Sequence, residues 1–315
     1  MGTSGTVLAL HDPELPGFVT DGGLETDLIF HHGVDLPEFA AFPLLDDHTG
    51  RLLLASYFDG YAAVAAAASA GLLVETPTWR ANPDWAQRVG YGARDLARVT
   101  RDSVIFARSL ARRYADDVPA VIVSGTLGPR GDGYVVGEVP RPEEARDYHA
   151  VAISAFAESG VDLVVAYTLT TAAEAVGVVL AARDAGVPVA VSFTVETDGR
   201  LPDGSTLAQA VAEVDALAPP EHYLVNCAHP SHVRAGLDGG AWQERVLGTR
   251  VNASARSHAE LDAADDLDDG DPELLANDQG DLSLLLPRLR VVGGCCGTDV
   301  RHVASMWGVP ESVGA

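Results

Sequence analysis

The stretch LRVVGGCCGT, residues 289–298, joins a short apolar run to paired glycines and then to two adjacent cysteines. Its β-branched residues are typical of a strand, and the glycines allow a sharp turn where the strand ends. The same pattern, an apolar run that stops at polar residues, recurs throughout the chain. It predicts strands at residues 18–23, 72–78, 120–127, 162–169, 188–195, 223–227, 245–252 and 289–294.

Segments of helical composition separate these runs. We expect helices at residues 52–70, 84–114, 142–159, 171–185 and 207–217, with Thr171 and Ser205 or Thr206 as capping residues. Most of the strands are continuously apolar, which is typical of parallel strands buried on both faces. The alternation predicts an α/β fold, a (β/α)8 TIM barrel that forms a single domain over residues 1–315. A doubly wound open sheet is the alternative.

The composition narrows the class of protein. The net charge is −24, and all 21 basic residues are arginine. A surface this acidic argues against binding to nucleic acid or to an anionic membrane. The N-terminus lacks the features of a signal peptide, and the apolar stretch at residues 61–74 is too short to cross a bilayer. Three cysteines make a disulfide framework improbable, so we expect a cytoplasmic protein.

The three cysteines occupy matching places in the predicted barrel. Cys227 ends the sixth predicted strand, and Cys295 and Cys296 follow the eighth. The carboxyl ends of barrel strands meet at one rim, which is where active sites lie. Three thiolates at this rim suit Zn²⁺ with a fourth position open. Two alternatives are three buried inert cysteines and a redox pair.

The charge of such a site indicates its chemistry. Three thiolates give the zinc site a net charge of about −1, which makes it a poor activator of water. The metal can still bind a fourth thiol and hold it as a thiolate at neutral pH. A zinc-bound thiolate is a soft nucleophile, and this favours methyl transfer to a thiol.

Three motifs carry a resemblance to a known family. GGCCGT at residues 293–298, VNC at 225–227 and DGGLET at 21–26 resemble the homocysteine S-methyltransferase family. Residues 124–134, 192–211 and 250–254 are similar to further regions of that family. The resemblance implies a barrel in which Cys227, Cys295 and Cys296 hold zinc. It also implies a thiol substrate, homocysteine giving methionine, that becomes the fourth ligand.

The resemblance extends to residues that bind the substrate. Asp21 matches a family acid that contacts the substrate amine, although an aspartate can also cap a glycine turn. Asn226 matches a residue packed beside the zinc. Together with their neighbours these positions give a predicted substrate-binding set of Asp21, Gly22, Glu25, Tyr167, Thr168 and Asn226.

The chain departs from the family after the fourth strand. Many members have a glutamate there that holds the homocysteine amino group, and Tyr167 stands in its place. We expect either that Glu25 supplies the missing carboxylate or that the thiol is not homocysteine. An alternative for Glu25 is an ordinary solvated loop residue.

The methyl donor is less well defined. No cobalamin or folate module fits beside a barrel in 315 residues, so we expect a small onium donor. S-methylmethionine, S-adenosylmethionine and betaine-like compounds belong to this class. Trp79 and Trp85 are candidates for a cation–π wall or for ordinary packing, and Tyr134 and Phe193 are weaker candidates.

Other interpretations stay open. A metal-dependent hydrolase would need a His-x-His motif, which the adjacent His31 and His32 do not provide. A barrel that binds zinc or a thiol as a sensor is the non-enzymatic alternative. We expect His229 and His302 to lie outside the ligand set. The acidic segment 260–275 is expected to be a solvated loop of undetermined role, and the sequence leaves a homo-oligomer open.

Overall fold

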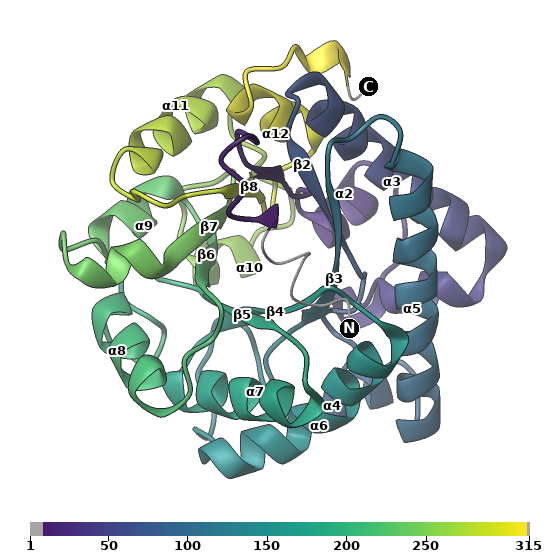
Figure 1. The fold of residues 1–315 in the computed structure, drawn as a ribbon, viewed down its shortest axis with the longest axis vertical. Helices are drawn as coiled ribbons and strands as arrows, with labels where there is room; N and C mark the ends of the chain where they lie inside the picture. The colour runs from purple at the N-terminus through teal and green to yellow at the C-terminus, as the bar shows by residue number, and fades with distance from the viewer. Residues whose placement is uncertain (1–8, 314–315) are drawn as a thin grey trace.

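Eight parallel strands close into a barrel in the computed structural model, which describes residues 9–313 (Figure 1). Each strand pairs with the next along the chain, and β8 pairs with β1. The predicted TIM barrel is therefore confirmed, and the open-sheet alternative is excluded. The strands are β1 (Phe18–Val19), β2 (Gly71–Glu75), β3 (Val121–Leu127), β4 (Leu163–Leu169), β5 (Val189–Phe193), β6 (Tyr223–Ala228), β7 (Val246–Val251) and β8 (Val291–Gly294).

Helices surround the barrel and connect its strands (Figure 1). The α-helices are α2 (Leu24–Phe30), α3 (His48–Ala67), α4 (Pro83–Arg88), α5 (Ala93–Tyr114), α6 (Pro142–Ser159), α7 (Ala172–Ala185), α8 (Leu207–Leu217), α9 (Pro230–Ala235), α10 (His258–Asp262), α11 (Pro272–Ser283) and α12 (Val300–Met306). Short 3₁₀ helices are η1 (Pro37–Phe39), η2 (Phe42–Asp46), η3 (Ala241–Arg245) and η4 (Glu311–Val313). Thr171 and Thr206 cap α7 and α8 through their hydroxyl oxygens, as their positions predicted.

The apolar residues form layers inside and outside the sheet. One cluster draws a buried residue from most of the strands, including Phe18, Leu73, Ile122 and Leu224, and so fills the barrel interior. Two larger clusters pack the outer faces of the strands against the helices. This solid interior leaves the strand ends as the place where a ligand can enter.

One predicted helix was wrong. The expected helix at residues 84–114 is two helices, α4 and α5, separated at Val89–Gly92. Gly90 has a φ of +88°, a conformation that ends a helix and favours glycine. Apolar residues keep a helical spacing on both sides of the break, so the periodicity of the sequence did not reveal it.

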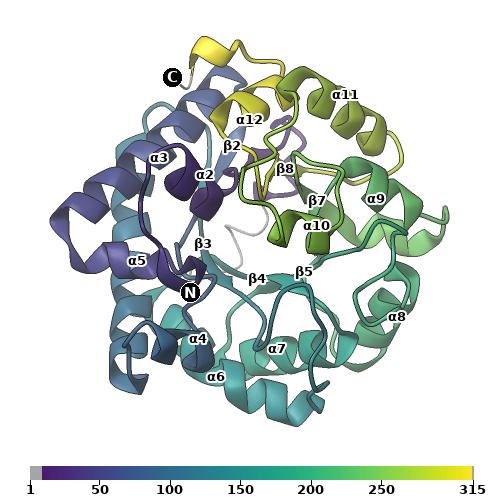
Figure 2. The same ribbon diagram turned by 180° about the vertical axis from the view of Figure 1, so that it is seen from behind.

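The acidic segment lies partly over the barrel. Figure 2 shows α10 and its following loop in front of the ends of β7 and β8. Asp262, Asp266 and Asp268 line the pocket at this end, so the prediction of a simple solvated loop was incomplete. Within residues 9–313, no helix has both the length and the apolar character needed to cross a membrane.

Candidate metal and substrate site

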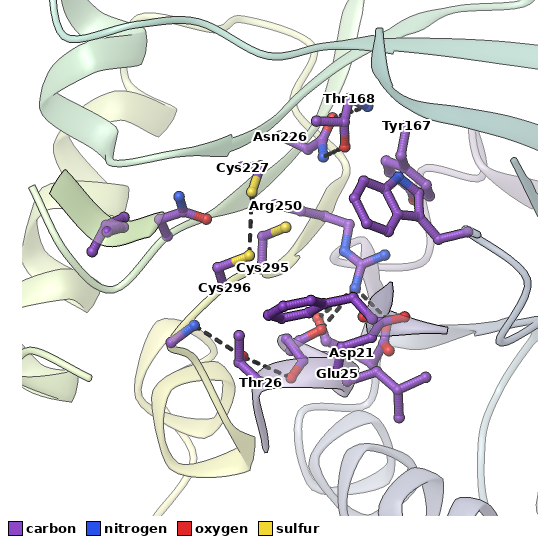
Figure 3. Close-up of a pocket in the computed structure, with 18 of the residues that line it drawn as sticks. Asp21, Glu25, Thr26, Tyr167, Thr168, Asn226, Cys227, Arg250, Cys295 and Cys296 are labelled. Atoms are coloured by element: carbon purple, nitrogen blue, oxygen red, sulfur yellow. Dashed lines mark hydrogen bonds and ion pairs between the residues drawn. The ribbon is translucent and has the colours of Figure 1, made fainter. Parts of the chain in front are cut away.

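The three cysteine sulfurs meet at the carboxyl end of the barrel. Cys227 Sγ lies 3.4 Å from Cys296 Sγ, and the ligand atoms of all three cysteines lie within 4.8 Å of one another. Figure 3 shows the thiols of Cys227, Cys295 and Cys296 gathered at one place. Tetrahedral zinc ligands at about 2.3 Å from the metal lie about 3.8 Å apart, so this arrangement fits one Zn²⁺ ion.

A bulge places Cys227 at the site. Its φ is +54°, which is rare for a residue with a side chain, and the β6–β7 register shifts between Asn226 and Ala228. The extra residue turns the cysteine relative to the regular alternation of the strand. Its sulfur thereby faces Cys296 although Cys227 is inside a strand.

Glycines shape the turn that carries the other two thiols. Gly297 has a φ of +79°, so the chain reverses directly after Cys296. A Cβ atom at Gly294 would collide with the Thr298 hydroxyl, which instead donates a hydrogen bond of 2.7 Å to the Cys295 carbonyl. The GGCCGT motif is therefore a compact turn that places adjacent thiols at the same site.

The three thiols shift one another's pKa values. Hydrogen bonds with Cys227 and Cys296 hold the pKa of Cys295 well below its ordinary value, and the Arg250 charge adds to this effect. The pKa of Cys227 is raised, first through its hydrogen bond with Cys295. One thiol of the group is thus already suited to act as a thiolate ligand.

Tyr134 and His258 cover one side of the thiols. The Tyr134 hydroxyl lies 2.9 Å from Cys227 Sγ, and the phenol ring stacks on His258 with centroids 4.3 Å apart. The two nitrogens of His258 face Glu196 Oε1 at 2.9 Å and the Cys227 carbonyl at 2.6 Å. His258 thus links Glu196 to the Cys227 backbone.

A buried arginine lies on the other side of the thiols. Arg250 donates to Asp21 Oδ1 at 2.7 Å and to Glu75 Oε2 at 2.8 Å. It also donates to the carbonyls of Gly22 and Gly294, each at 2.9 Å. Although burial opposes the charge of Arg250, the two carboxylates raise its pKa well above the ordinary value. Figure 3 shows this side chain passing between the cysteines and Asp21.

This pairing changes the role that the sequence indicated for Asp21. Its carboxylate accepts hydrogen bonds from Arg250, from Tyr57 at 3.1 Å and from Thr20 at 3.3 Å. Burial raises the pKa of Asp21 to about 6 despite the opposing effect of Arg250. Little of this carboxylate is left for a substrate ammonium group.

Tyr167 is joined to the same network. Its hydroxyl donates to Glu75 Oε1 at 2.5 Å, and its ring lies beneath the Arg250 guanidinium at 4.9 Å. Glu75 and Arg250 line the pocket, and the sequence reasoning missed both of them. Glu75 ends β2 and Arg250 is next to the end of β7, so a charged residue within each otherwise apolar predicted strand was a usable signal.

Glu25 lines the pocket without a side-chain partner among the described contacts. Burial raises its pKa to about 7, and the nearby charges of Cys295 and Asp21 contribute. A cationic ligand beside this carboxyl group would stabilise its charged form. The solvated-loop interpretation of Glu25 does not fit this position.

Asn226 binds the neighbouring strand ends together. Its Oδ1 accepts from the Thr168 amide at 2.8 Å and the Ser192 hydroxyl at 2.6 Å. Its Nδ2 donates to the Thr168 hydroxyl at 2.9 Å. Thr168 itself has a φ of +61°, so both Thr168 and Cys227 hold unusual backbone conformations around this amide.

The remaining candidates from the sequence do not join the cysteine group, although Trp79 lines the same pocket. His229 caps α9, and His302 is buried against Asp299, so neither joins the cysteine group. The rings of Trp79 and Trp85 both face the guanidinium of Arg80, at 4.1 Å and 3.7 Å. Phe193 is buried in the outer core.

A second cluster of ligand-type atoms combines Asp27, His31 and Asp299. None of these residues lines the pocket at the cysteines.

The pocket above the thiols has a volume of about 400 Å³, which is within the usual range for a small-molecule site. All nine predicted site residues line it: Asp21, Gly22, Glu25, Tyr167, Thr168, Asn226, Cys227, Cys295 and Cys296. The pocket therefore combines three thiols with a buried ion-pair network and a carboxyl group of raised pKa.

Comparison with known structures supports the architecture. The Escherichia coli homocysteine methyltransferase MmuM in its oxidised form is 20% identical, with a TM-score of 0.76 over 96% of this chain and 99% of that one. The metallated form is 19% identical, with a TM-score of 0.73 over 96% and 98% of the two chains. The apo form, also 19% identical, gives 0.68 over 96% and 99%.

At these identities the likeness to solved structures shows the fold. A comparison with curated protein sequences gave no match. Residues 18–307, however, match the family described as homocysteine S-methyltransferase, which is nearly the whole chain. The chain belongs to the homocysteine S-methyltransferase family and is a thiol S-methyltransferase.

Proposed function

We propose that this enzyme binds Zn²⁺ through Cys227, Cys295 and Cys296 and transfers a methyl group from a small onium donor to homocysteine, giving methionine. The observation that carries the proposal is the meeting of the three sulfurs within 4.8 Å at the end of the barrel. A zinc ion held by these thiolates would lower the pKa of a thiol at its fourth position and so would favour the substrate thiolate.

The protein groups orient the acceptor. Because Arg250 already forms an ion pair with Asp21, we assign the substrate ammonium group to Glu25. A cation near Glu25 would favour its ionised form, whose pKa burial otherwise raises to about 7. Tyr167 acts indirectly in this proposal, since its hydroxyl holds Glu75 in the network around Arg250.

The reaction is a displacement at the methyl carbon. A bond forms between the acceptor sulfur and the methyl group as the bond from that carbon to the donor's sulfonium or ammonium centre breaks. The donor's electron pair returns to its cationic atom, which leaves neutral. Asp262, Asp266 and Asp268 at the pocket favour the approach of a cationic donor.

The proposal also covers the domain organisation and the compartment of the enzyme. We assign residues 1–315 to one catalytic barrel domain that needs small molecules only. Thiols that bind metal must stay reduced, so we place the enzyme in the cytoplasm. A homo-oligomer is compatible with this function.

Methyl transfer tests this function directly. Reduced protein is incubated with homocysteine and deuteromethyl-labelled S-methylmethionine, S-adenosylmethionine or glycine betaine, and labelled methionine is measured by mass spectrometry. We expect labelled methionine from one of these donors, loss of transfer after removal of the metal, and recovery when Zn²⁺ is restored. Zinc binding without transfer from any donor would contradict the assignment of homocysteine and these donors, and unchanged transfer by stably metal-free protein would contradict the zinc mechanism.

A further inference from the structure

Arg80 is a buried cation that has no hydrogen-bond or ion-pair partner within residues 9–313. Only 7% of the residue is exposed, and its Nε and Nη1 atoms are buried with no hydrogen-bond partner among the described residues. Within that part of the chain, no carboxylate forms an ion pair with it. Burial lowers the pKa of Arg80, as expected for a charge removed from water. A buried charge left unpaired is costly, so its retention calls for an explanation.

Two indole rings hold this guanidinium. Its central carbon lies 4.1 Å from the Trp79 ring centroid and 3.7 Å from that of Trp85. Stacking on aromatic faces stabilises the charge but leaves the N–H groups at the edge of the plane unused. The rings therefore fix the direction of the donors without satisfying them.

A second donor points to the same conclusion. Trp79 Nε1 is also buried without a partner among the described residues, and both Trp79 and Arg80 line the pocket that contains the cysteines. Donors from two side chains are thus left unsatisfied at one wall. The acidic groups Glu25 and Asp132 line the same pocket, but neither forms an ion pair with Arg80.

Arg250 cannot take this role. Its N–H groups are directed at Asp21, Glu75 and the carbonyls of Gly22 and Gly294. Arg80 is therefore the arginine of this pocket that keeps donors for an anionic ligand. A guanidinium offers paired N–H groups that match the two oxygens of a carboxylate.

We propose that Arg80, together with the Trp79 N–H group, forms an anion subsite that binds the carboxylate of one of the two substrates. This inference rests on the proposed function and deepens it. The carboxylate can belong to the acceptor thiol or to the methyl donor, since homocysteine, S-methylmethionine and betaine all carry one. Glu25 and Arg80 then give the pocket one group for each charge of an amino-acid substrate.

Binding measurements test the subsite separately from catalysis. Zinc-loaded wild type and Arg80→Gln are titrated calorimetrically with homocysteine and with 3-aminopropane-1-thiol, which lacks only the carboxylate. The donor arm uses S-methylmethionine and its decarboxylated sulfonium analogue. Arg88→Gln is the matched control, because Arg88 also lies over the Trp85 ring, at 4.3 Å, but is exposed and paired with Glu38.

We expect Arg80→Gln to weaken one carboxylate-bearing ligand by about 10- to 100-fold, the usual effect of losing a charged hydrogen bond. Binding of that ligand's carboxylate-free analogue stays unchanged, and so does binding to Arg88→Gln. The ligand that loses affinity identifies the source of the carboxylate. If Arg80→Gln does not fold, Arg80→Lys replaces it, with a smaller loss that is again confined to the carboxylate-bearing ligand.

Two results would overturn the subsite. One is equal weakening of the carboxylate-bearing ligand and its analogue, or no weakening at all. The other is the absence of binding of both carboxylate-bearing ligands to the wild type. Failure of the proposed function looks different: Arg80-dependent binding without methyl transfer would leave the subsite in place and refute the reaction.

Discussion

Asn226 links two residues whose backbone conformations are unusual. Thr168 and Cys227 have φ angles of +61° and +54°, and each lies at a register shift near the end of its strand. The Asn226 amide bonds both the main chain and the hydroxyl of Thr168. Such strain persists only where the surroundings hold it, and at this site it directs a metal-binding side chain.

Replacing this amide should therefore affect both stability and the metal. We expect Asn226→Ala to lower the unfolding free energy by about 2–3 kcal/mol, because it leaves buried polar partners unsatisfied. We also expect zinc affinity to fall about tenfold or more, because the variant loosens the support of Cys227. Urea unfolding and zinc competition with a chelator measure the two effects.

Asn252→Ala provides a control within the same pocket. Asn252 is equally buried, and its Oδ1 has no partner among the described residues. Its removal should cost less than that of Asn226 and should leave zinc affinity unchanged. Equal effects of the two variants would show that the Asn226 hydrogen bonds do not support the site.

Glu25 provides the test of acceptor recognition. Glu25→Gln removes the negative charge at constant size, so we expect the KM for homocysteine to rise about tenfold, as for a lost charged hydrogen bond. Steady-state kinetics with varied homocysteine measures this, and the exposed Glu38→Gln serves as the control. An unchanged KM would mean that the ammonium group binds elsewhere.

Single residues also show where sequence reasoning reached its limit. The cysteines and Asp21 could be identified because short motifs surround them. The Arg250–Glu75 ion pair joins residues 175 positions apart, and no local pattern reveals such a partner. The consequence, that Asp21 is already paired, could only come from the three-dimensional arrangement.

The ends of a helix were predictable where a proline or a capping residue accompanies the helical periodicity. Helices α6 and α8 have the expected bounds, since Pro142 begins one and Thr206 caps the other. Several strands were predicted a few residues too long because the prediction included turn residues that follow the strand, as at β1 (Phe18–Val19), where it ran on through residues 20–23. The α4–α5 break was missed although the sequence GYG at residues 90–92 marks it.

Two glycines, one inside a helix and one at the break between two helices, can be compared by mutation. Gly280 lies inside α11 with nothing near an added Cβ, so Gly280→Ala should stabilise the protein by about 0.5–1 kcal/mol. Gly90 has equal space but a φ of +88°, so Gly90→Ala should destabilise it by about 1–2 kcal/mol. Urea unfolding compares the pair, and effects of the same sign would contradict this account.

At the scale of the whole molecule, the alternation of strands and helices was sufficient for the fold. The barrel closes because eight parallel strands pair in chain order, and each apolar run buries both faces. The sequence pattern was not sufficient to predict substrate specificity, because specificity depends on which charges are already paired inside the pocket. Arg80 illustrates this, since its lack of a partner cannot be read from its neighbours in sequence.

Global stability should depend on a histidine remote from the thiols. Burial, and the charges of His11 and Arg245, lower the pKa of His222 to about 3. The unfolded chain binds this proton near pH 6.5, so its contribution is fully present above that pH and is lost as the pH falls toward 3. At pH 5 the loss amounts to about 2 kcal/mol.

His222→Gln isolates this contribution from other titrating groups. The decrease in unfolding free energy between pH 7 and pH 5 should be smaller in the variant by about 2 kcal/mol. Urea unfolding at both pH values gives the comparison. Identical pH dependence in the two proteins would show that His222 does not titrate in the unfolded chain alone.

The metal content of freshly reduced protein decides whether the three cysteines form a zinc site. Wild type, Cys295→Ser and the pocket control Glu25→Gln are purified in parallel, and zinc and free thiols are measured. We expect one zinc per chain in the wild type and in Glu25→Gln, with a sharp fall in Cys295→Ser. A wild type without zinc, in which the three cysteines titrate as free thiols, would contradict the zinc site.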